Sequence, residues 1–229
     1  MDTIDIEAIV NRVVTRVLAE QAAPAAETCG MESNISIPVE MSARHVHLSQ
    51  AHARELFGTD LTPVRELSQP GQFLCKERVR LIGPKGVMDQ VAVLGPSRSD
   101  SQVEISLTDA RSLGLDGAIR QSGDTAGTPG LILSSGKAFA ALPQGVIVAG
   151  RHIHMGPEDA QRLQVKDRDR VCVSVESTRP AIFRDVLVRV HPDFRLALHI
   201  DADEANGCGW TKDTVCRIVR SGKEGLCPA

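Results

Sequence analysis

The sequence predicts a mainly β protein made of two similar halves, each a small β-barrel or β-sandwich with short helices. The motif Arg-His-Val-His-Leu at residues 44–48 recurs as Arg-His-Ile-His-Met at residues 151–155, which indicates an internal duplication. Apolar and polar residues alternate over short stretches such as 79–82 and 170–175, and this period of two is typical of strands. Gly, Pro and Asp separate these stretches, whereas segments of helical period are few and short.

The first 20 residues predict an amphipathic helix that is joined to the rest of the chain by a linker. Apolar side chains recur at helical spacing from Ile6 to Val17, and the opposite face carries charges of both signs. Residues 21–34 are rich in Ala, Pro and Gly and have no periodicity, which is typical of a linker. Such a helix either docks back on its own domain or binds another protein, and we favour the second. The mixed charges argue against a membrane anchor.

The two halves match again further along the chain. Residues 91–106, around Glu104, align without a gap with residues 186–201, around His199. The offset is 95 here and 107 at the first motif, so the first copy is 12 residues longer. We place this insertion at about residues 59–76, which are rich in turn residues.

Short helices are expected to follow each matched motif. Ser49 is a favourable N-cap, and Gly156 with Pro157 occupies the corresponding place in the second copy. Thr108 and Asp203 mark a second matched pair of helix starts.

The repeat also brings together residue types that bind metals. In a strand, residues i and i+2 project from one face roughly 6.6 Å apart, so a His-x-His pair can direct two imidazoles at one cation. Glu104 in the first copy and His199 in the second are ligand types at equivalent places. Two triads follow from this pattern: His45, His47 and Glu104, and His152, His154 and His199. Three protein ligands with an open fourth position are typical of catalytic zinc, although nickel, cobalt or manganese suit the same spacing.

Arg98 and Ser122 are candidate substrate-binding residues. Arg98 lies in a predicted loop six residues before Glu104, and a guanidinium beside a metal can bind an oxyanion or a phosphate. A solvated loop charge is the alternative interpretation. Ser122 lies in a polar, Gly-containing segment that either contacts substrate or forms an ordinary turn. His52 and His191 have no such partners and are predicted surface residues.

Composition excludes several function classes. The net charge is −3, with 26 basic against 29 acidic residues, and Phe, Trp and Tyr make up only 3% of the chain. These values argue against nucleic-acid binding by charge or by base stacking. The apolar runs are too short for a membrane span, and no secretory signal is present, so we expect a cytoplasmic protein that acts on a small molecule. No motif suggests a covalent nucleophile.

These motifs resemble those of the PduL-type phosphotransacylases, the phosphate propanoyltransferases of bacterial microcompartments. The resemblance covers about residues 36–220. It rests on Ser-Ala-Arg-His45-Val-His47-Leu-Ser, Gly-Arg-His152-Ile-His154-Met, Leu-His199-Ile-Asp-Ala-Asp-Glu-Ala, Gln-Val-Glu104-Ile-Ser after Arg98, and Glu66-Leu-Ser-Gln-Pro-Gly-Gln-Phe.

The resemblance implies two β-barrels capped by short α-helices, with the first strand swapped into the C-terminal barrel. The implied domains are one barrel from residues 35–43 plus 150–220, a second from residues 44–149, and a tail at residues 221–229. Residues 1–20 resemble the peptide that directs such enzymes into a microcompartment by binding a shell or cargo protein. A homo-oligomer is compatible with this organisation.

The resemblance also implies a reaction and a site. Acyl-CoA, either propanoyl-CoA or acetyl-CoA, reacts with phosphate to give acyl phosphate and CoA, or the reverse, as in propanediol degradation. Two zinc ions per chain lie between the barrels, one on each triad. Arg98 holds the phosphate and Ser122 lies nearby.

Three other functions remain open at this point. Glu158 after the second His-x-His pair fits a cupin metal box, although Ala51 stands at that place in the first copy. A binuclear hydrolase also uses His-x-His pairs, but its usual barrel is longer and alternates strands with long helices. The non-enzymatic alternative is a microcompartment cargo protein whose zinc is structural.

Overall fold

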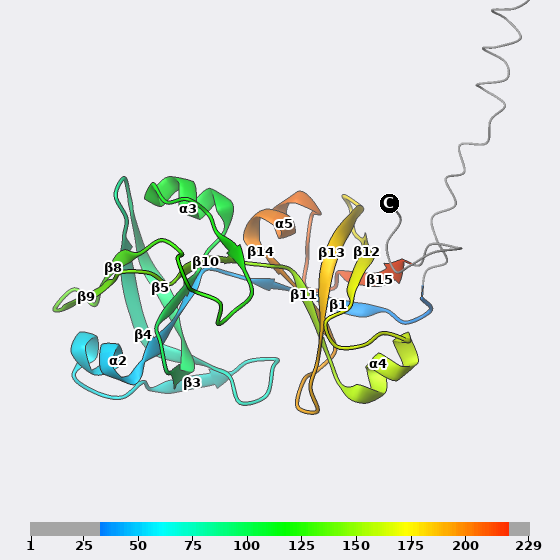
Figure 1. The fold of residues 1–229 in the computed structure, drawn as a ribbon, viewed down its shortest axis with the longest axis horizontal. Coiled ribbons are helices and arrows are strands. Elements are labelled where there is room, and N and C mark those ends of the chain that lie inside the picture. Colours follow the sequence, from blue (N-terminus) through cyan, green and yellow to red (C-terminus); the bar gives the residue numbers. More distant parts are fainter. Residues whose placement is uncertain (1–32, 220–229) are drawn as a thin grey trace, which may run out of the picture.

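The computed structural model describes residues 33–219 and consists of two β units that lie side by side (Figure 1). This part of the chain is mainly strand with four short helices, and the predicted fold class is confirmed. The predicted helix at residues 1–20 and the tail at residues 221–229 lie outside the described residues. None of the helices between residues 33 and 219 has the length and apolar character needed to cross a membrane.

The C-terminal unit is a closed barrel of six strands. Its order is β1 (Ile37–Ser42), β14 (Ala197–Asp201), β11 (His152–Met155), β13 (Ala181–Val190), β12 (Arg170–Glu176) and β15 (Val215–Val219). The barrel closes because β1 pairs in parallel with β14 on one side and antiparallel with β15 on the other. Inward-facing Ile37, Ile153, Val173 and Ile218 are fully buried in its core.

The N-terminal unit is a nine-stranded sheet that curls. Its order is β7 (Ile119–Arg120), β10 (Val146–Ala149), β6 (Gln102–Glu104), β2 (His45–Ser49), β5 (Val87–Arg98), β4 (Phe73–Ile82), β8 (Leu131–Ser134) and β9 (Phe139–Leu142), with β3 (Pro63–Glu66) added to β4. In the C-terminal barrel every strand pairs with a strand on both sides, whereas the strand order of this sheet does not return to its start. A backbone hydrogen bond, from Val146 N to Pro129 O at 3.0 Å, links β10 to the residues just before β8. The C-terminal unit is therefore a closed barrel and the N-terminal unit is not.

The two halves exchange a strand. β1 precedes the first His-x-His strand in the chain, yet it pairs with β14 of the C-terminal barrel, where Glu40 lies opposite His199. β10 precedes the second His-x-His strand, yet it pairs with β6 of the N-terminal sheet, where Ile147 lies opposite Glu104. Because each sheet contains a strand from the other half, the two units are held together by backbone hydrogen bonds.

Four capped helices follow the matched motifs. They are α2 (Gln50–Phe57), α3 (Leu107–Leu113), α4 (Pro157–Leu163) and α5 (Ala202–Gly207). Ser49 caps α2, and Gly156 precedes Pro157 at the start of α4, as predicted. The other two helices begin slightly earlier than expected, since Ser106 and Asp201 are the N-caps, each in a capping box with the residue three positions later.

Candidate active site

The two predicted triads occupy the same position in the two halves. In the N-terminal sheet, β2 pairs antiparallel with β6, and His45 lies directly opposite Glu104. In the C-terminal barrel, β11 pairs antiparallel with β14, and His152 lies directly opposite His199. Each His-x-His strand thus faces the strand that carries the third predicted ligand, in the same register.

The first triad is compact and buried. His45 Nε2 lies 3.6 Å from Glu104 Oε2, and His47 Nε2 lies 3.8 Å from Glu104 Oε1. Candidate ligand atoms of the three residues all lie within 4.8 Å of one another, a spacing that could hold a metal ion. His45 Nδ1 lies 2.8 Å from Ala43 O. Because a carbonyl can only accept, this nitrogen carries a hydrogen, so in the neutral ring Nε2 is the nitrogen that offers a lone pair to the cluster.

The second triad consists of three imidazoles. The ring centroids of His152 and His199 are 5.2 Å apart, and that of His154 lies 4.6 Å from the first and 4.8 Å from the second. His152 Nδ1 lies 2.9 Å from Gly150 O, which repeats the contact of His45 with Ala43. Both ring nitrogens of His154 are buried without a hydrogen-bond partner, and its ring packs 4.0 Å from that of Phe194.

Burial keeps most of these imidazoles neutral. It lowers the pKa of His47 to about 3, that of His154 to about 2, and those of His152 and His199 to about 4. Burial opposes protonation of His45 as well, but the Glu104 carboxylate outweighs it and raises the pKa of His45. Burial alone would raise the pKa of Glu104, whereas His45 and His47 hold it well below its usual value.

These protonation states suit a metal ion. A ligating histidine must offer a lone pair and a ligating carboxylate must be ionised. The lowered pKa values of the other four triad histidines and of Glu104 meet these conditions near neutral pH, whereas His45, whose pKa is raised, must release its second proton when an ion binds. A buried polar atom without a partner costs about 1–3 kcal/mol, so the unpaired nitrogens of His154 require something to satisfy them. A cation can bind one of these nitrogens, and the donor set of nitrogens and a carboxylate oxygen is that of zinc-type ions.

Arg98 and Ser122 contact the first triad directly. Arg98 Nη2 donates to His47 Nε2 at 2.8 Å, and Nη1 donates to Ser122 Oγ at 2.9 Å. Ser122 Oγ donates in turn to Glu104 Oε1 at 2.9 Å. The predicted loop around Arg98 is wrong, because Arg98 is the last residue of strand β5. A bulge brings it level with Ser49 on β2, and this places its guanidinium beside the cluster.

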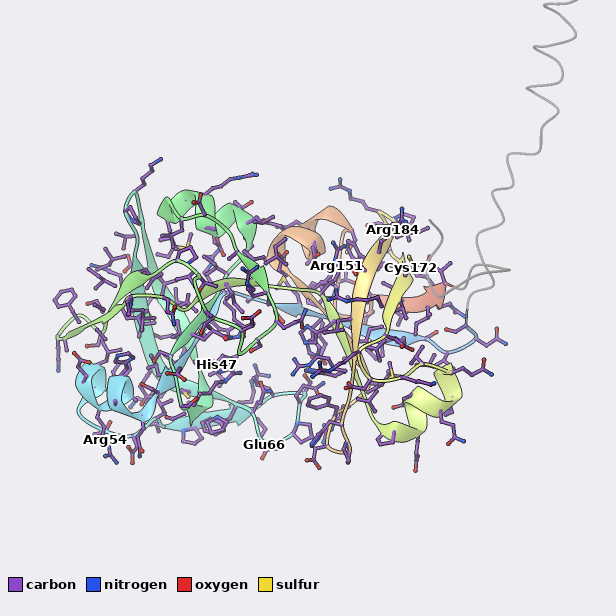
Figure 2. All side chains as sticks on the ribbon, viewed as in Figure 1. His47, Arg54, Glu66, Arg151, Cys172 and Arg184 are labelled. Carbon is purple, nitrogen blue, oxygen red and sulfur yellow. The ribbon has the colours of Figure 1, made fainter. Side chains whose placement is uncertain are left out.

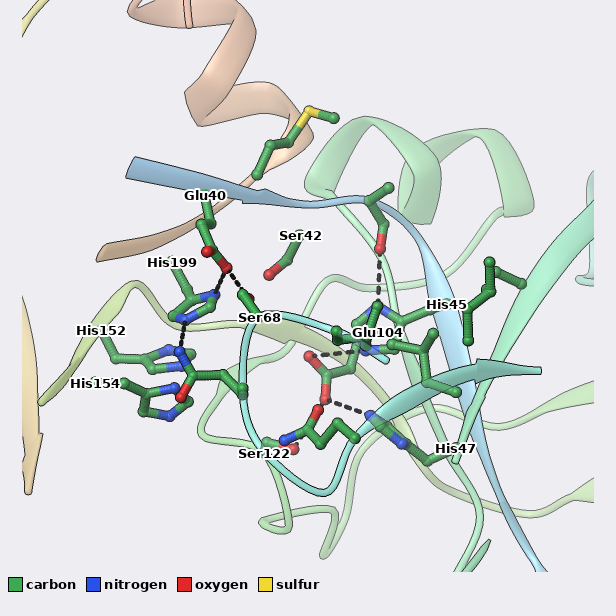
Figure 3. Close-up of a pocket in the computed structure, with 18 of the residues that line it drawn as sticks. Glu40, Ser42, His45, His47, Ser68, Glu104, Ser122, His152, His154 and His199 are labelled. Atoms are coloured by element: carbon green, nitrogen blue, oxygen red, sulfur yellow. Dashed lines mark hydrogen bonds and ion pairs between the residues drawn. The ribbon is translucent and has the colours of Figure 1, made fainter. Parts of the chain in front are cut away.

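Both triads line one cavity of about 490 Å³. Figure 3 shows His152, His154 and His199 on one side of this space, with His45, His47 and Glu104 on the other. The Glu104 charge acts on His152 and His199 from the opposite half, which raises their pKa slightly against the effect of burial. The fold therefore brings six residues from four strands, two per half, to one site.

Several residues of the cavity were not found from the sequence. Arg189 on β13 lies opposite His154 and has no hydrogen bond or ion pair within the described residues; its guanidinium lies 5.7 Å from the Phe194 ring. Gln102 does not line the cavity, but it donates to Glu104 Oε1 at 2.6 Å from the same strand. A signal for Arg189 existed, since in the repeat it takes the place of Leu94 within an otherwise apolar stretch.

Three other predicted features fall outside the triads. His52 takes part in neither triad, as predicted, but it is half-buried instead of lying fully on the surface, and its Nδ1 lies 2.8 Å from Ser101 Oγ. His191 is exposed, as predicted, with Asp193 at 3.5 Å. Glu158 is exposed in the first turn of α4 and does not line the cavity, which argues against a cupin metal box.

Comparison with known proteins identifies a family. The sequence model of the phosphate propanoyltransferases matches residues 38–211. A phosphate propanoyltransferase of Leptotrichia buccalis is 57% identical over 187 residues, which cover 81% of this chain and 89% of that protein. One from Sebaldella termitidis is 48% identical over 222 residues, covering 96% of this chain and all of the relative. One from Enterococcus faecalis is 56% identical over 176 residues, covering 76% and 83%.

Proposed function

This chain belongs to the phosphate propanoyltransferase family of acyltransferases, and we propose that it transfers a short acyl group, propanoyl or acetyl, between coenzyme A and phosphate. The observation that carries this proposal is the convergence of two metal-ligand triads and Arg98 on one cavity. Such a cavity combines groups that bind an anion with groups that stabilise charge on a reacting carbonyl.

We include two zinc ions per chain in this proposal. His45, His47 and Glu104 would hold one ion, and His152, His154 and His199 the other. Their ligand types, the lowered pKa values of His47 and His199, and the unpaired nitrogens of His154 support this assignment. When bound, zinc would act as a Lewis acid toward a carbonyl oxygen, a phosphate oxygen or a thiolate sulfur.

Arg98 is proposed to bind phosphate. Its guanidinium now donates to the Nε2 lone pair of a neutral histidine, His47, which is a weaker acceptor than an anion. If this lone pair is given to an ion, Arg98 gains free donors that point into the cavity. Ser122 fixes the other side of the guanidinium through Nη1, and Arg189 adds a second positive charge from the opposite half. Two arginines of this kind can orient a phosphate oxygen toward the acyl carbon.

The acyl group is proposed to pass directly from sulfur to phosphate. A phosphate oxygen attacks the thioester carbonyl, a new C–O bond forms, and the C–S bond breaks as CoA leaves as a thiolate. The reverse reaction exchanges the roles of the two nucleophiles. Residues of the chain bind and orient the anion, and no side chain carries the acyl group. Detection of an acylated side chain during turnover would contradict this part of the proposal.

We also propose that the enzyme acts inside a bacterial microcompartment. The amphipathic pattern of residues 1–20 and the linker that follows support this, with a shell or cargo protein as the partner. We keep residues 35–43 with 150–220 as one domain and 44–149 as the other, a division consistent with the pairing of β1 with β14.

One experiment tests the catalytic proposal. Metal content of the purified chain is measured, and CoA release from a panel of short acyl-CoAs is followed with and without phosphate. We expect two zinc ions per chain and CoA release that depends on phosphate. A chain that stays fully active after exhaustive chelation would be an acyltransferase of another mechanism. A chain that releases no CoA would be a non-catalytic cargo protein.

A further inference from the structure

The insertion of the first half reaches the second half. Residues 67–72 follow strand β3 and lie within the predicted insertion at 59–76. Leu67, Ser68, Gln69 and Gln72 among them line the cavity. Gln69 in this segment is only 5% exposed. Its Nε2 donates to Arg195 O at 3.2 Å, and Arg195 N donates to its Oε1 at 3.2 Å. The Gln69 amide thus pairs with both backbone groups of Arg195, as a neighbouring strand would, although the two residues are far apart in the sequence.

The same segment approaches the third ligand of the second triad. Ser68 Oγ donates to Glu40 Oε2, and the same carboxylate oxygen lies 3.8 Å from His199 Nδ1. Gln69 Nε2 lies 3.5 Å from His199 Nε2. Figure 3 shows Glu40 between Ser68 and His199, on strand β1 that has crossed over from the other half. Two elements that belong to the first copy by sequence therefore surround His199.

His199 differs in this respect from His45 and His152, the other two triad histidines whose Nδ1 has a partner. His45 and His152 both use the backbone carbonyl two residues earlier in the chain. Facing Nδ1 of His199 is a carboxylate instead, brought by strand exchange. A metal-binding histidine commonly directs its second nitrogen to such a carboxylate, which fixes the ring and strengthens the ligand.

We propose that Glu40, held by Ser68, is a positioning residue that keeps the hydrogen of His199 on Nδ1 and so presents Nε2 to a metal ion at the second triad. This inference rests on the proposed function, in which that triad holds an ion. Each half then uses one carboxylate. Glu104 belongs to the first triad itself, whereas Glu40 stands outside the second and supplies negative charge to a ligand set that has none.

The first test is metal binding by the full chain after removal of its metal by a chelator. Co²⁺ is titrated back and followed by absorption, and Zn²⁺ affinity is obtained by competition. Glu40→Gln and Glu40→Ala are expected to weaken the binding of one of the two ions by roughly 10–100-fold and to leave the affinity for the other unchanged. Glu40→Asp is expected to recover part of this loss. Glu66→Gln is the control, because Glu66 is exposed at the end of strand β3, next to this segment, and does not line the cavity (labelled in Figure 2).

The outcomes separate the two proposals. If the wild-type chain binds two ions, His154→Ala loses one, and Glu40→Ala binds both as tightly as Glu66→Gln does, then Glu40 has no positioning role and the inference is overturned. If the wild-type chain and His154→Ala bind the same number of ions, the second triad holds no metal, and the two-zinc part of the proposed function fails instead.

The second test does not need the metal or the reaction. Long-range nitrogen–proton NMR spectra of the metal-free chain, with ¹⁵N-labelled histidine, report which ring nitrogen of His199 carries the hydrogen. We expect Nδ1–H in the wild type and in Glu66→Gln, and a mixture of both tautomers in Glu40→Ala. Gln69→Ala is expected to shift the tautomer less, because Glu40 and Ser68 remain in place. An unchanged tautomer in Glu40→Ala would refute the positioning role even in a correctly folded variant.

Discussion

The two triads share a backbone arrangement but differ in charge and in hydrogen bonding. In the first, Glu104 is ionised and receives hydrogen bonds from Ser122 and Gln102. In the second, three neutral imidazoles stand together, and His154 has no hydrogen-bond partner on either nitrogen. The first ligand set carries one negative charge and the second none. An ion on the second triad would therefore keep more of its positive charge, and with Arg189 nearby we expect that side of the cavity to attract an anion more strongly.

The comparison shows that duplication copies the scaffold more faithfully than the chemistry. Strands pair through backbone hydrogen bonds, which do not require a particular side chain, and both halves keep the same register at the site. A single side-chain difference, Glu104 against His199, then gives the two triads different charges. The variants below test whether this difference has the consequences that we assign to it.

The largest effect is expected from removing one ligand of each triad. His47→Ala and His154→Ala should each lose one ion and reduce activity by roughly 10³-fold, because an ion contributes several kcal/mol of charge stabilisation. Metal analysis and CoA release measure the two effects. The exposed His191→Ala is the control. If either triad can lose a ligand without loss of activity, the two halves are not both part of the active site.

Arg98→Ala should have the next largest effect. We expect activity to fall by about 10²-fold or more with both ions still bound, since a charged donor to the reacting anion is lost. The exposed Arg54→Ala on α2, which pairs with Asp60, is the matched control. Loss of an ion from Arg98→Ala would mean that this arginine supports the first triad instead of the phosphate.

Arg189→Ala completes that comparison from the other half. If both arginines hold phosphate, KM for phosphate should rise by roughly tenfold in Arg189→Ala, with little change in KM for acyl-CoA. Initial rates over a range of phosphate concentrations measure this change. An equal rise for both substrates would instead indicate a general disturbance of the cavity.

His45 and His199 should contribute to the free energy of unfolding with opposite dependence on pH. The pKa of His199 is lowered to about 4, so an unfolded chain binds this proton more readily, and stability is lost as pH falls from about 6.5 toward 4. The pKa of His45 is raised, so its contribution is present below pH 6.5 and is lost as pH rises through its folded value. Urea unfolding of the metal-free chain at pH 5, 6 and 7 tests this contrast.

Each histidine has its own expected change in that series. His199→Gln should flatten the loss of stability on acidification, whereas His45→Gln should steepen it. Equal changes in the two variants would show that the Glu104 charge does not distinguish the triads.

The smallest effects are expected at the matched helix caps. Ser106→Ala and Asp201→Ala each remove an N-cap from the helix that follows the third ligand strand. Each should reduce the free energy of unfolding by about 1 kcal/mol, measured in urea. A much larger loss in one half would show that its capped helix supports more of the site than its counterpart does.

Much of the site could be predicted from local patterns. His45 and His47 project from one face because a strand has a period of two, and the repeat pointed to Glu104 and His199 as equivalent third positions. Other features depended on contacts that no local pattern reports. Arg98 was chosen correctly as a neighbour of the cluster, but its strand and the bulge that directs it were not expected. Gln69 was missed because its partner His199 lies 130 residues away.

The sequence by itself determined the duplication, the alternating strands, the capped helices and the six candidate ligands, because period, spacing and cap residues act over a few neighbouring positions. The crossing of β1 into the C-terminal barrel was expected only from the family resemblance, and the pairing of β1 with β14 agrees with it. The tertiary structure alone decided that β10 crosses in the other direction, that one barrel closes while the other sheet curls open, and that Glu40 and Ser68 meet His199. Strand register and closure depend on hydrogen bonds between distant segments, and their free energy is shared among many residues, so no short stretch of sequence specifies them.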